Sequence, residues 1–196
     1  MPQFDHREIA QPVAERSFEA IASELSPVLR RYLKRTVGDR ALADDLLQET
    51  LIRMARGLPG FAGRASLKTW AFAIATRVAA DHFRNPETRV RIVEMDEAEQ
   101  VADTARTDDE RIVVDEMNAC VRQVIDGLPE AYRAALVLHD IEEFTAGQVA
   151  GICNCSVATA KMRIHRARDR LKEALQQQCR FYRDGDEVFR CERKPP

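Results

Sequence analysis

The sequence of 196 residues lacks the features that mark membrane-spanning and secreted proteins. No apolar run approaches the roughly 20 residues that a helix needs to cross a bilayer, and the N-terminus has no signal-peptide pattern. Aromatic residues make up only 6% of the chain. We therefore expect a cytoplasmic protein without membrane insertion, whose five cysteines serve as thiols, metal ligands or redox groups rather than as permanent disulfides.

Signatures of catalysis are also lacking. The four histidines are scattered and form no metal-ligand pair at helical spacing: His6, His82, His139 and His165. The sequence contains no glycine-rich phosphate loop, no nucleophile elbow and no convincing pair of acids. It thus predicts no catalytic residue and favours a binding or regulatory protein over an enzyme.

Helical periodicity is what the sequence does contain, and it predicts an all-α fold of two small helical domains. In the first half, helices are expected over 17–37, 40–57 and 67–84. The segment 86–110 loses this periodicity and is dominated by Asp and Glu, which is typical of an acidic linker. A plain spacer and a linker that also binds something both remain open.

Five segments follow from this pattern. They are an N-terminal extension (1–16), a first helical domain (17–85), the linker (86–110), a second helical domain (111–178) and a short Cys-bracketed tail (179–196). Within the second domain, further helices are expected at 111–126, 130–139 and 146–152.

The second domain ends in a short helix, a tight turn and a basic helix. Thr145 and Gln148 have the spacing of a capping box that starts the short helix. Asn154 suits a left-handed turn, and Ser156 is a good N-cap for the segment "SVATAKMRIHRARDRL". At 100° per residue, the apolar stripe of this last helix is expected to be buried: Val157, Ala160, Ile164, Ala167, Leu171, Ala174 and Leu175. This order of elements predicts a helix-turn-helix.

The polar side of the basic helix is suited to the major groove of DNA. Arg and Lys pair with phosphates or guanine edges, whereas Thr and Met can contact a thymine methyl group. The candidate DNA contacts are Ser156, Thr159, Lys161, Met162, Arg163, Arg166 and Arg170. The alternative is a solvated surface helix with scattered arginines.

The stretch "QVAGICNCSVATAKMRIHRARDRL" resembles the region of bacterial RNA polymerase sigma factors that reads the upstream promoter element, in the small extracytoplasmic-function type. The matching positions are Ser156, Thr159, Lys161, Arg163, His165, Arg166 and Arg168. Gln148, Ala160 and Met162 depart from the Glu, Val and Ser that are usual there. Met162 is expected to be exposed and to alter which promoter is read.

Two stretches of the first half resemble other parts of the same family. "ALADDLLQETLIRMARGLPGF" is similar to its polymerase-binding helix, and "SLKTWAFAIATRVAADHFR" is similar to its promoter-melting helix. Together the matches cover about residues 17–178. The resemblance implies a sigma factor, which directs the RNA polymerase core to specific promoters and initiates transcription.

The helix over 40–57 has two distinct faces. An apolar arc is expected to pack inward: Ala43, Leu47, Leu51, Met54, Ala55 and Leu58. A separate acidic and apolar face suits a protein partner, and comprises Asp45, Gln48, Glu49 and Ile52. The resemblance implies that this partner is RNA polymerase core, which the family binds through the coiled coil of the largest subunit and through the flap. A solvated acidic face is the alternative.

The loop and helix at 60–84 combine aromatic rings with cations, which suits single-stranded DNA because bases stack on rings and phosphates meet cations. The candidate contacts with the start-proximal element are Phe61, Arg64, Ser66, Lys68, Arg77 and Arg84. The resemblance implies that this part opens the element and captures an extruded base. Arg77 stands where the family commonly has Asn, and Trp70 is interpreted as a packing residue.

The tail "CRFYRDGDEVFRC" is typical of a small hairpin bracketed by Cys179 and Cys191. A three-residue turn at 184–186 would place the two cysteines opposite each other, within reach of a disulfide. A zinc site that adds Cys153 and Cys155 is disfavoured, because a straight helix over 156–178 separates Cys155 from Cys179 by about 36 Å. We expect no cofactor, although zinc or a disulfide at a redox- or metal-responsive tail stays open beside incidental thiols.

The residues alone leave other functions open. A stand-alone helix-turn-helix regulator would bind an operator tightly without polymerase, usually as a symmetric dimer. A metal or redox sensor would bind metal through the tail cysteines. The sigma factor reading implies three partners instead: RNA polymerase core, promoter DNA and an anti-sigma factor, which is the usual regulator in the family.

Overall fold

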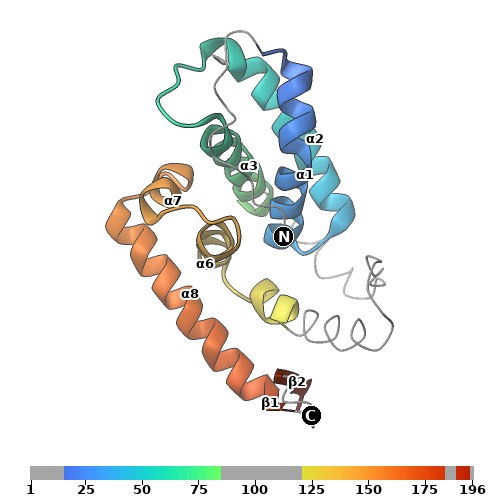
Figure 1. Cartoon of the computed structure of the whole chain (residues 1–196), viewed down its shortest axis with the longest axis vertical. Helices are drawn as coiled ribbons and strands as arrows, with labels where there is room; N and C mark the ends of the chain where they lie inside the picture. Colours follow the sequence, from blue (N-terminus) through green and yellow to red (C-terminus); the bar gives the residue numbers. More distant parts are fainter. Residues whose placement is uncertain (1–15, 85–120, 184–188, 195–196) are drawn as a thin grey trace.

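The computed structural model describes residues 16–84, 121–183 and 189–194. In chain order its elements are α1 (Phe18–Val37), α2 (Arg40–Gly57), η2 (Leu58–Gly60), α3 (Leu67–Arg84), α6 (Glu130–Leu136), η3 (Val137–Ile141), α7 (Ala146–Ile152), α8 (Val157–Gln178), β1 (Cys179–Arg183) and β2 (Phe189–Arg193). A helical stretch at 121–126 precedes α6. Within the described ranges the only strands form one hairpin and every other regular element is helical, which confirms the all-α prediction (Figure 1). The expected linker and residues 1–15 of the N-terminal extension lie outside the described residues.

The helices of the N-terminal half begin and end where local capping requires. The Ser17 hydroxyl accepts a hydrogen bond from the Ala20 amide (3.3 Å) at the start of α1, and Asp39 caps α2 through the Leu42 amide (2.6 Å). Between them, Gly38 ends α1 in the left-handed region at φ 79°, where a side chain would be strained. The predicted bounds of these three helices are confirmed to within one residue.

The predicted helix-turn-helix is present in the C-terminal half. The Thr145 amide donates to Gln148 Oε1 (2.9 Å) and the Gln148 amide donates to Thr145 Oγ1 (3.3 Å), so the capping box of α7 is complete. Asn154 takes a left-handed φ of 49° in the turn. Ser156 then caps α8 by accepting from the Thr159 amide (3.1 Å).

The helix expected over 130–139 differs from the structure. It is α6 followed by the π-helical turn η3, because the Glu142 amide donates to the Val137 carbonyl five residues earlier (3.0 Å). This wider turn places Glu142 and Phe144 on the inner side of the molecule, where both are buried.

One hydrophobic core continues from the N-terminal half into the C-terminal half. Phe72 of α3 lies 5.1 Å from the ring of Tyr32 in α1 and 4.9 Å from the ring of Phe144, measured between centroids. Helix α7 packs beside α3, as Figure 1 also shows. The periodicity of each half predicts its own helices but contains no sign of this contact between them.

The buried stripe of α8 is narrower than the sequence predicts. Ala160, Ile164 and Ala167 are buried as expected, and Leu171, Ala174 and Leu175 are half-buried. Val157 is 48% exposed, so its assignment to the buried stripe is wrong. Ala160, three residues further on, is fully buried, so the side of the first turn that faces the neighbouring helices runs through Ala160 and not through Val157.

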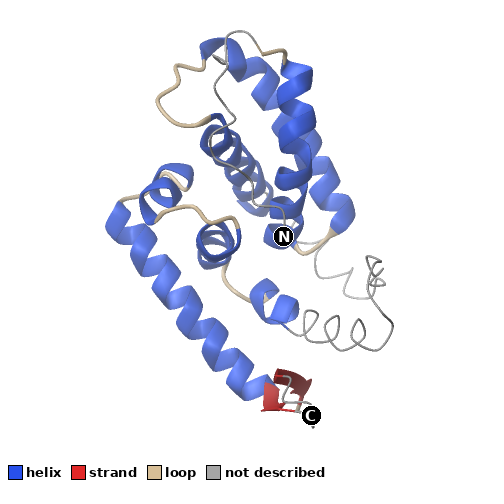
Figure 2. Ribbon diagram, in the orientation of Figure 1, coloured by secondary structure: helices blue, strands red, loops and turns tan. Residues whose placement is uncertain are grey.

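The hairpin tail follows α8 directly (Figure 2). Its antiparallel register pairs Cys179 with Arg193 and Phe181 with Cys191. The strands end at Arg183 and resume at Phe189, so the predicted three-residue turn and the directly opposed cysteine pair are both wrong. The straight helix that separates Cys155 from Cys179 is confirmed.

Candidate nucleic-acid and protein-binding surfaces

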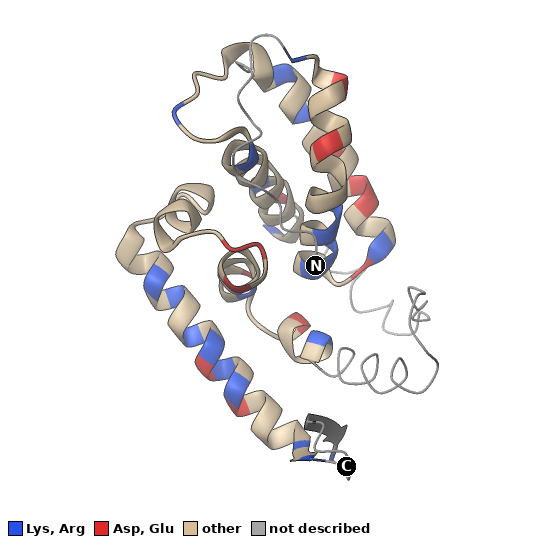
Figure 3. Ribbon diagram, in the orientation of Figure 1, with Lys and Arg blue, Asp and Glu red and all other residues tan. Residues whose placement is uncertain are grey.

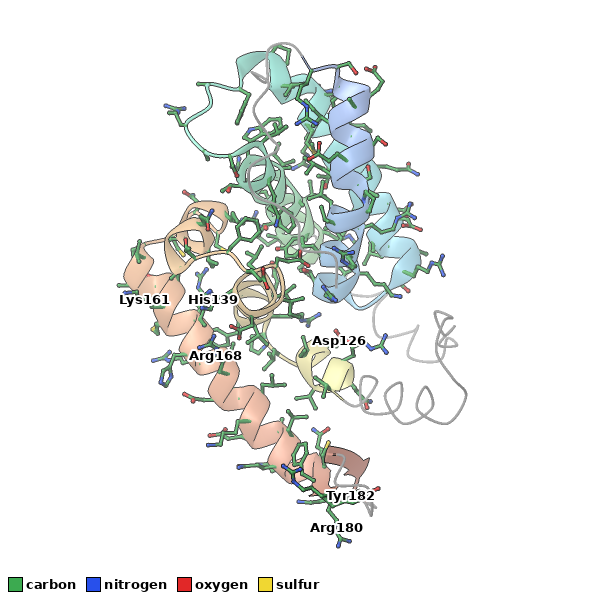
Figure 4. All side chains as sticks on the ribbon, in the orientation of Figure 1. Asp126, His139, Lys161, Arg168, Arg180 and Tyr182 are labelled. Carbon is green, nitrogen blue, oxygen red and sulfur yellow. The ribbon has the colours of Figure 1, made fainter. Side chains whose placement is uncertain are left out.

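Helix α8 presents most of its predicted DNA contacts to solvent. Lys161, Met162, Arg166 and Arg170 are exposed, and Arg163 is half-buried. Figure 3 shows cations along much of this helix, and Figure 4 places Lys161 and Arg168 on it. The structure therefore brings these predicted contacts together on one helix that begins at a capped, tight turn.

Two of the predicted contacts have a local structural role. The Ser156 hydroxyl accepts from the Thr159 amide and is also hydrogen-bonded to the Thr159 hydroxyl (2.8 Å). These contacts satisfy an amide that the first turn of a helix otherwise leaves without a partner. Ser156 and Thr159 thus fix where α8 begins.

The arginines of α8 have neighbours of two different kinds. Arg168 Nε donates to Asp140 Oδ2 of η3 (2.9 Å), in an ion pair that engages both carboxylate oxygens. Arg170 instead lies over the ring of Tyr132 in α6, 4.8 Å from the ring centroid. A hydrogen bond from Arg166 to the Tyr132 hydroxyl lowers the pKa of that phenol.

Sequence reasoning missed Tyr132. The only signal for it is an aromatic side chain in the helix before the turn, and many core positions share that feature. Its importance appears only once α6 is packed along α8.

The loop before α3 is held by aromatic packing. The rings of Phe61 and Trp70 are tilted and 5.1 Å apart. A Cβ atom built at Gly57 would lie 3.1 Å from Trp70, so the indole packs against the end of α2. These contacts support the interpretation of Trp70 as a packing residue, and they leave Arg64 exposed in the loop.

The remaining start-proximal candidates lie along α3. The Ser66 hydroxyl accepts from the Thr69 amide (3.0 Å) and begins this helix, while Arg77 is exposed. Arg84 Nη2 donates to Asp81 Oδ1 (2.6 Å). A hydrogen bond from Arg53 of α2, and a weaker contribution from Arg84, lower the pKa of Asp81.

Lys68 differs from the other candidates because the C-terminal half covers it. Its Nζ atom lies 5.0 Å from the ring centroid of Phe144 and 5.8 Å from that of Phe72. The ammonium group is therefore in cation–π geometry with a ring from each half. In this arrangement a predicted DNA contact belongs to the interface between the halves.

Polar contacts also join the two halves. Arg35 Nη1 of α1 pairs with Glu142 Oε1 at 3.1 Å, and Glu142 is only 8% exposed. Arg133 of α6 donates through Nη1 to the Thr36 carbonyl at the end of α1 (2.8 Å), and it also donates to the carbonyls of Asp126 and Leu128. One guanidinium thus satisfies the carboxyl ends of two helical segments from different halves.

Helix α2 has the two faces that the sequence predicts, with two exceptions. Asp45, Gln48 and Ile52 are exposed, and Glu49 pairs with Arg53 Nε at 2.7 Å. Ala43, Leu47 and Met54 are buried and Leu51 and Leu58 are half-buried, as the predicted arc requires. The exceptions are Ala55, which is exposed, and Leu46, which is buried although it lies outside the predicted arc. Leu46 belongs to the hydrophobic core that α2 shares with α1 and α3.

Comparisons with known proteins decide the family. The description "Sigma-70 region 2" fits residues 21–89, and "Sigma-70, region 4" fits residues 118–171. RNA polymerase sigma-H factor of Pseudomonas aeruginosa is 30% identical over 169 residues, which cover 83% of this chain and 88% of that protein. The extracytoplasmic-function sigma factor EcfG of Rhodopseudomonas palustris is 31% identical over 167 residues, covering 83% of this chain and 84% of that one.

The chain belongs to the extracytoplasmic-function group of RNA polymerase sigma factors. This confirms the predicted family and its function of directing transcription initiation, and it does not favour a stand-alone regulator. Region 2 corresponds to α1–α3, and region 4 to the segment from 121 to α8.

Solved structures agree in fold. The sigma factor RpoE of Bartonella quintana, in complex with the anti-sigma factor NepR, has a TM-score of 0.63 at 25% identity and covers 81% of this chain and 96% of that one. CnrH, in complex with the cytosolic domain of CnrY, has a TM-score of 0.59 at 17% identity and covers 84% and 92%. The second likeness concerns the fold alone.

Two absences concern the described part of the chain only. None of its helices is long and apolar enough to cross a membrane. It contains no group of three or more His, Cys, Asp or Glu side chains arranged to hold a metal ion.

Proposed function

We propose that this sigma factor binds RNA polymerase core with the outer face of α2 and contacts promoter DNA with two surfaces, one in region 4 and one in region 2. The observation that carries the proposal is the placement of α8. A complete capping box, a left-handed turn at Asn154 and a Ser156 cap present the polar side of a basic helix to solvent. This is the geometry with which a recognition helix enters a major groove.

In the upstream contact, the arginines provide affinity and a few side chains provide selectivity. Arg163, Arg166 and Arg170 face the phosphates or guanine edges, and binding weakens as salt rises because counterions are released. Met162 is 41% exposed and is apolar, so it contacts a thymine methyl group rather than a polar base edge.

The polymerase contact is built around an exposed apolar residue. Ile52 is 45% exposed on α2, with Gln48 and Asp45 on the preceding turns. An apolar centre with a polar rim is typical of protein interfaces. The proposed partner surface is the coiled coil of the largest polymerase subunit, with the flap as the contact of region 4.

Region 2 melts the start-proximal element, and region 4 must first move away from α3. Arg64 and Arg77 are exposed and available to DNA phosphates. Lys68 is not, because its ammonium group lies against Phe144 of region 4. Full contact with DNA therefore requires the interface between the halves to open.

An anti-sigma factor is the proposed regulator. RpoE of B. quintana was solved with the anti-sigma factor NepR bound. RpoE shares a quarter of its residues with this chain over most of both lengths. A partner of this kind that binds region 2 and region 4 together would keep Lys68 covered.

The test is transcription by polymerase core with and without this protein, on duplexes that the holoenzyme selects from a random-sequence library. Arg163→Ala with Arg166→Ala should abolish selective initiation while core binding is retained. Asp45→Ala with Ile52→Ala should weaken core binding at least tenfold, whereas the exposed Glu19→Ala on α1 should not. Full core affinity in the α2 variant would show that the partner face has been assigned wrongly.

A further inference from the structure

Tyr132 lies at a junction between α6 and α8. Its ring packs beside a small buried cluster of Leu128, Leu136 and Ala167, and Leu171 of α8 packs against the same cluster. The ring is therefore anchored on its inner side. Its outer side and its hydroxyl group remain available to side chains of α8.

One arginine of α8 contacts this phenol, and two others lie near it. The Arg170 guanidinium lies over the ring, with Cζ 4.8 Å from the centroid. Hydrogen bonding with Arg166, followed by the charges of Arg166, Arg170 and Arg163, lowers the pKa of Tyr132. The contact that joins Tyr132 to α8 by geometry is therefore the one with Arg170.

The other flank of α8 is held in a chemically different way. Arg168 is paired with the Asp140 carboxylate, which neutralises its charge. In the described parts of the chain, no carboxylate forms an ion pair with Arg163, Arg166 or Arg170. A phenol fixes the direction of a guanidinium but leaves its positive charge in place.

We propose that Tyr132 is a positioning residue for upstream promoter recognition: it holds Arg170 on one flank of α8, still charged, where the phosphates of the DNA strand pass. This inference rests on the proposed function of α8. It assigns the stronger phosphate contacts to the side of α8 that faces Tyr132. The side that carries Arg168, whose charge is paired with Asp140, makes weaker phosphate contacts.

The physical gain is a lower ordering cost on binding. A free arginine side chain samples many rotamers and loses that freedom when it binds a phosphate. Arg170 has already lost part of it against Tyr132. Removal of the aromatic ring should therefore weaken DNA binding by about two- to fivefold, the size expected of one exposed cation–π contact.

The experiment is a double-mutant cycle with full-length protein in the polymerase holoenzyme, on a duplex selected by the wild-type holoenzyme. Tyr132→Leu removes the ring under Arg170 and keeps an apolar side chain against Leu128 and Leu136. Thermal unfolding checks that the variant is folded. The cycle combines it with Arg170→Ala. Tyr182→Leu, at an exposed tyrosine of the tail, is the matched control.

Tyr132→Leu should weaken binding, Tyr182→Leu should not, and Tyr132→Leu should have no further effect once Arg170 is alanine. An equal loss in the Arg170→Ala background, or no loss in either background, would overturn the positioning role. A different result would refute the proposed function itself. If the Arg166→Ala and Arg170→Ala variants both bound the promoter normally, α8 would not be the helix that contacts DNA.

Discussion

Phe144 offers the sharpest test of how the two halves are held together. Its side chain is 4% exposed and contacts Phe72 and Lys68, both of which belong to α3. Truncation of a buried Phe to Ala costs about 3–5 kcal/mol in protein cores. Because these contacts of Phe144 reach across to region 2, we expect at least about 3 kcal/mol of this cost to destabilise the arrangement in which regions 2 and 4 are packed together. The equilibrium between packed and separated regions should then shift about a hundredfold toward the separated ones.

Small-angle X-ray scattering measures this shift without labels. The Phe144→Ala variant should show a larger radius of gyration than the wild type at equal concentration, while circular dichroism shows the same helix content. Phe61→Ala is the control, since Phe61 packs on Trp70 within region 2. That variant should stay as compact as the wild type.

The reasoning fails if Phe144→Ala remains as compact as the wild type although it is fully folded. Such a result would mean that polar contacts, chiefly those of Arg133 and the pair of Arg35 with Glu142, hold the halves together alone. Expansion of both the Phe144 and the Phe61 variants would also refute it, because the effect would then not be specific to the interface.

Three further predictions concern titratable groups. Glu142→Gln should lower the free energy of unfolding by about 1 kcal/mol in chemical denaturation, because Arg35 keeps its charge but loses its buried partner. Burial raises the pKa of the Cys153 thiol to about 11, so iodoacetamide at pH 8 should modify it far more slowly than Cys155, as peptide mass spectrometry would show; equal rates would contradict this. Burial lowers the pKa of His82, so the folded state favours the neutral imidazole. The contribution of the neutral ring to the free energy of unfolding is full above about pH 6.5 and is lost as the pH falls. The His82→Gln variant should therefore lose less stability than the wild type in thermal melts between pH 7 and pH 5.

Local signals in the sequence predicted the helix ends well. The caps at Ser156 and Thr145 join groups no more than three residues apart, so their residue types alone specify them. The same holds for the breaks at Gly38 and Asp39. The basic character of α8 and its exposed polar side follow from the helical repeat in the same way.

Predictions failed where burial depends on a neighbour. Val157 fits the apolar stripe of α8 but is 48% exposed, whereas Leu46 lies outside the predicted arc of α2 but is buried in the core with residues of α1 and α3. The hairpin register also differs, since Cys191 pairs with Phe181. The two-residue period of a strand permits several registers, and the length of the connection selects one of them.

The sequence by itself determined the helices, their caps, the helix-turn-helix and the family, because each depends on residue types at short, fixed spacing. Only the tertiary structure decided that Lys68 is covered by Phe144, that Arg133 joins α1 to region 4, and that Arg170 of α8 lies over the ring of Tyr132. These contacts join residues from different helices, as much as 97 positions apart for Arg133 and Thr36, and no local pattern encodes which faces meet when the helices pack.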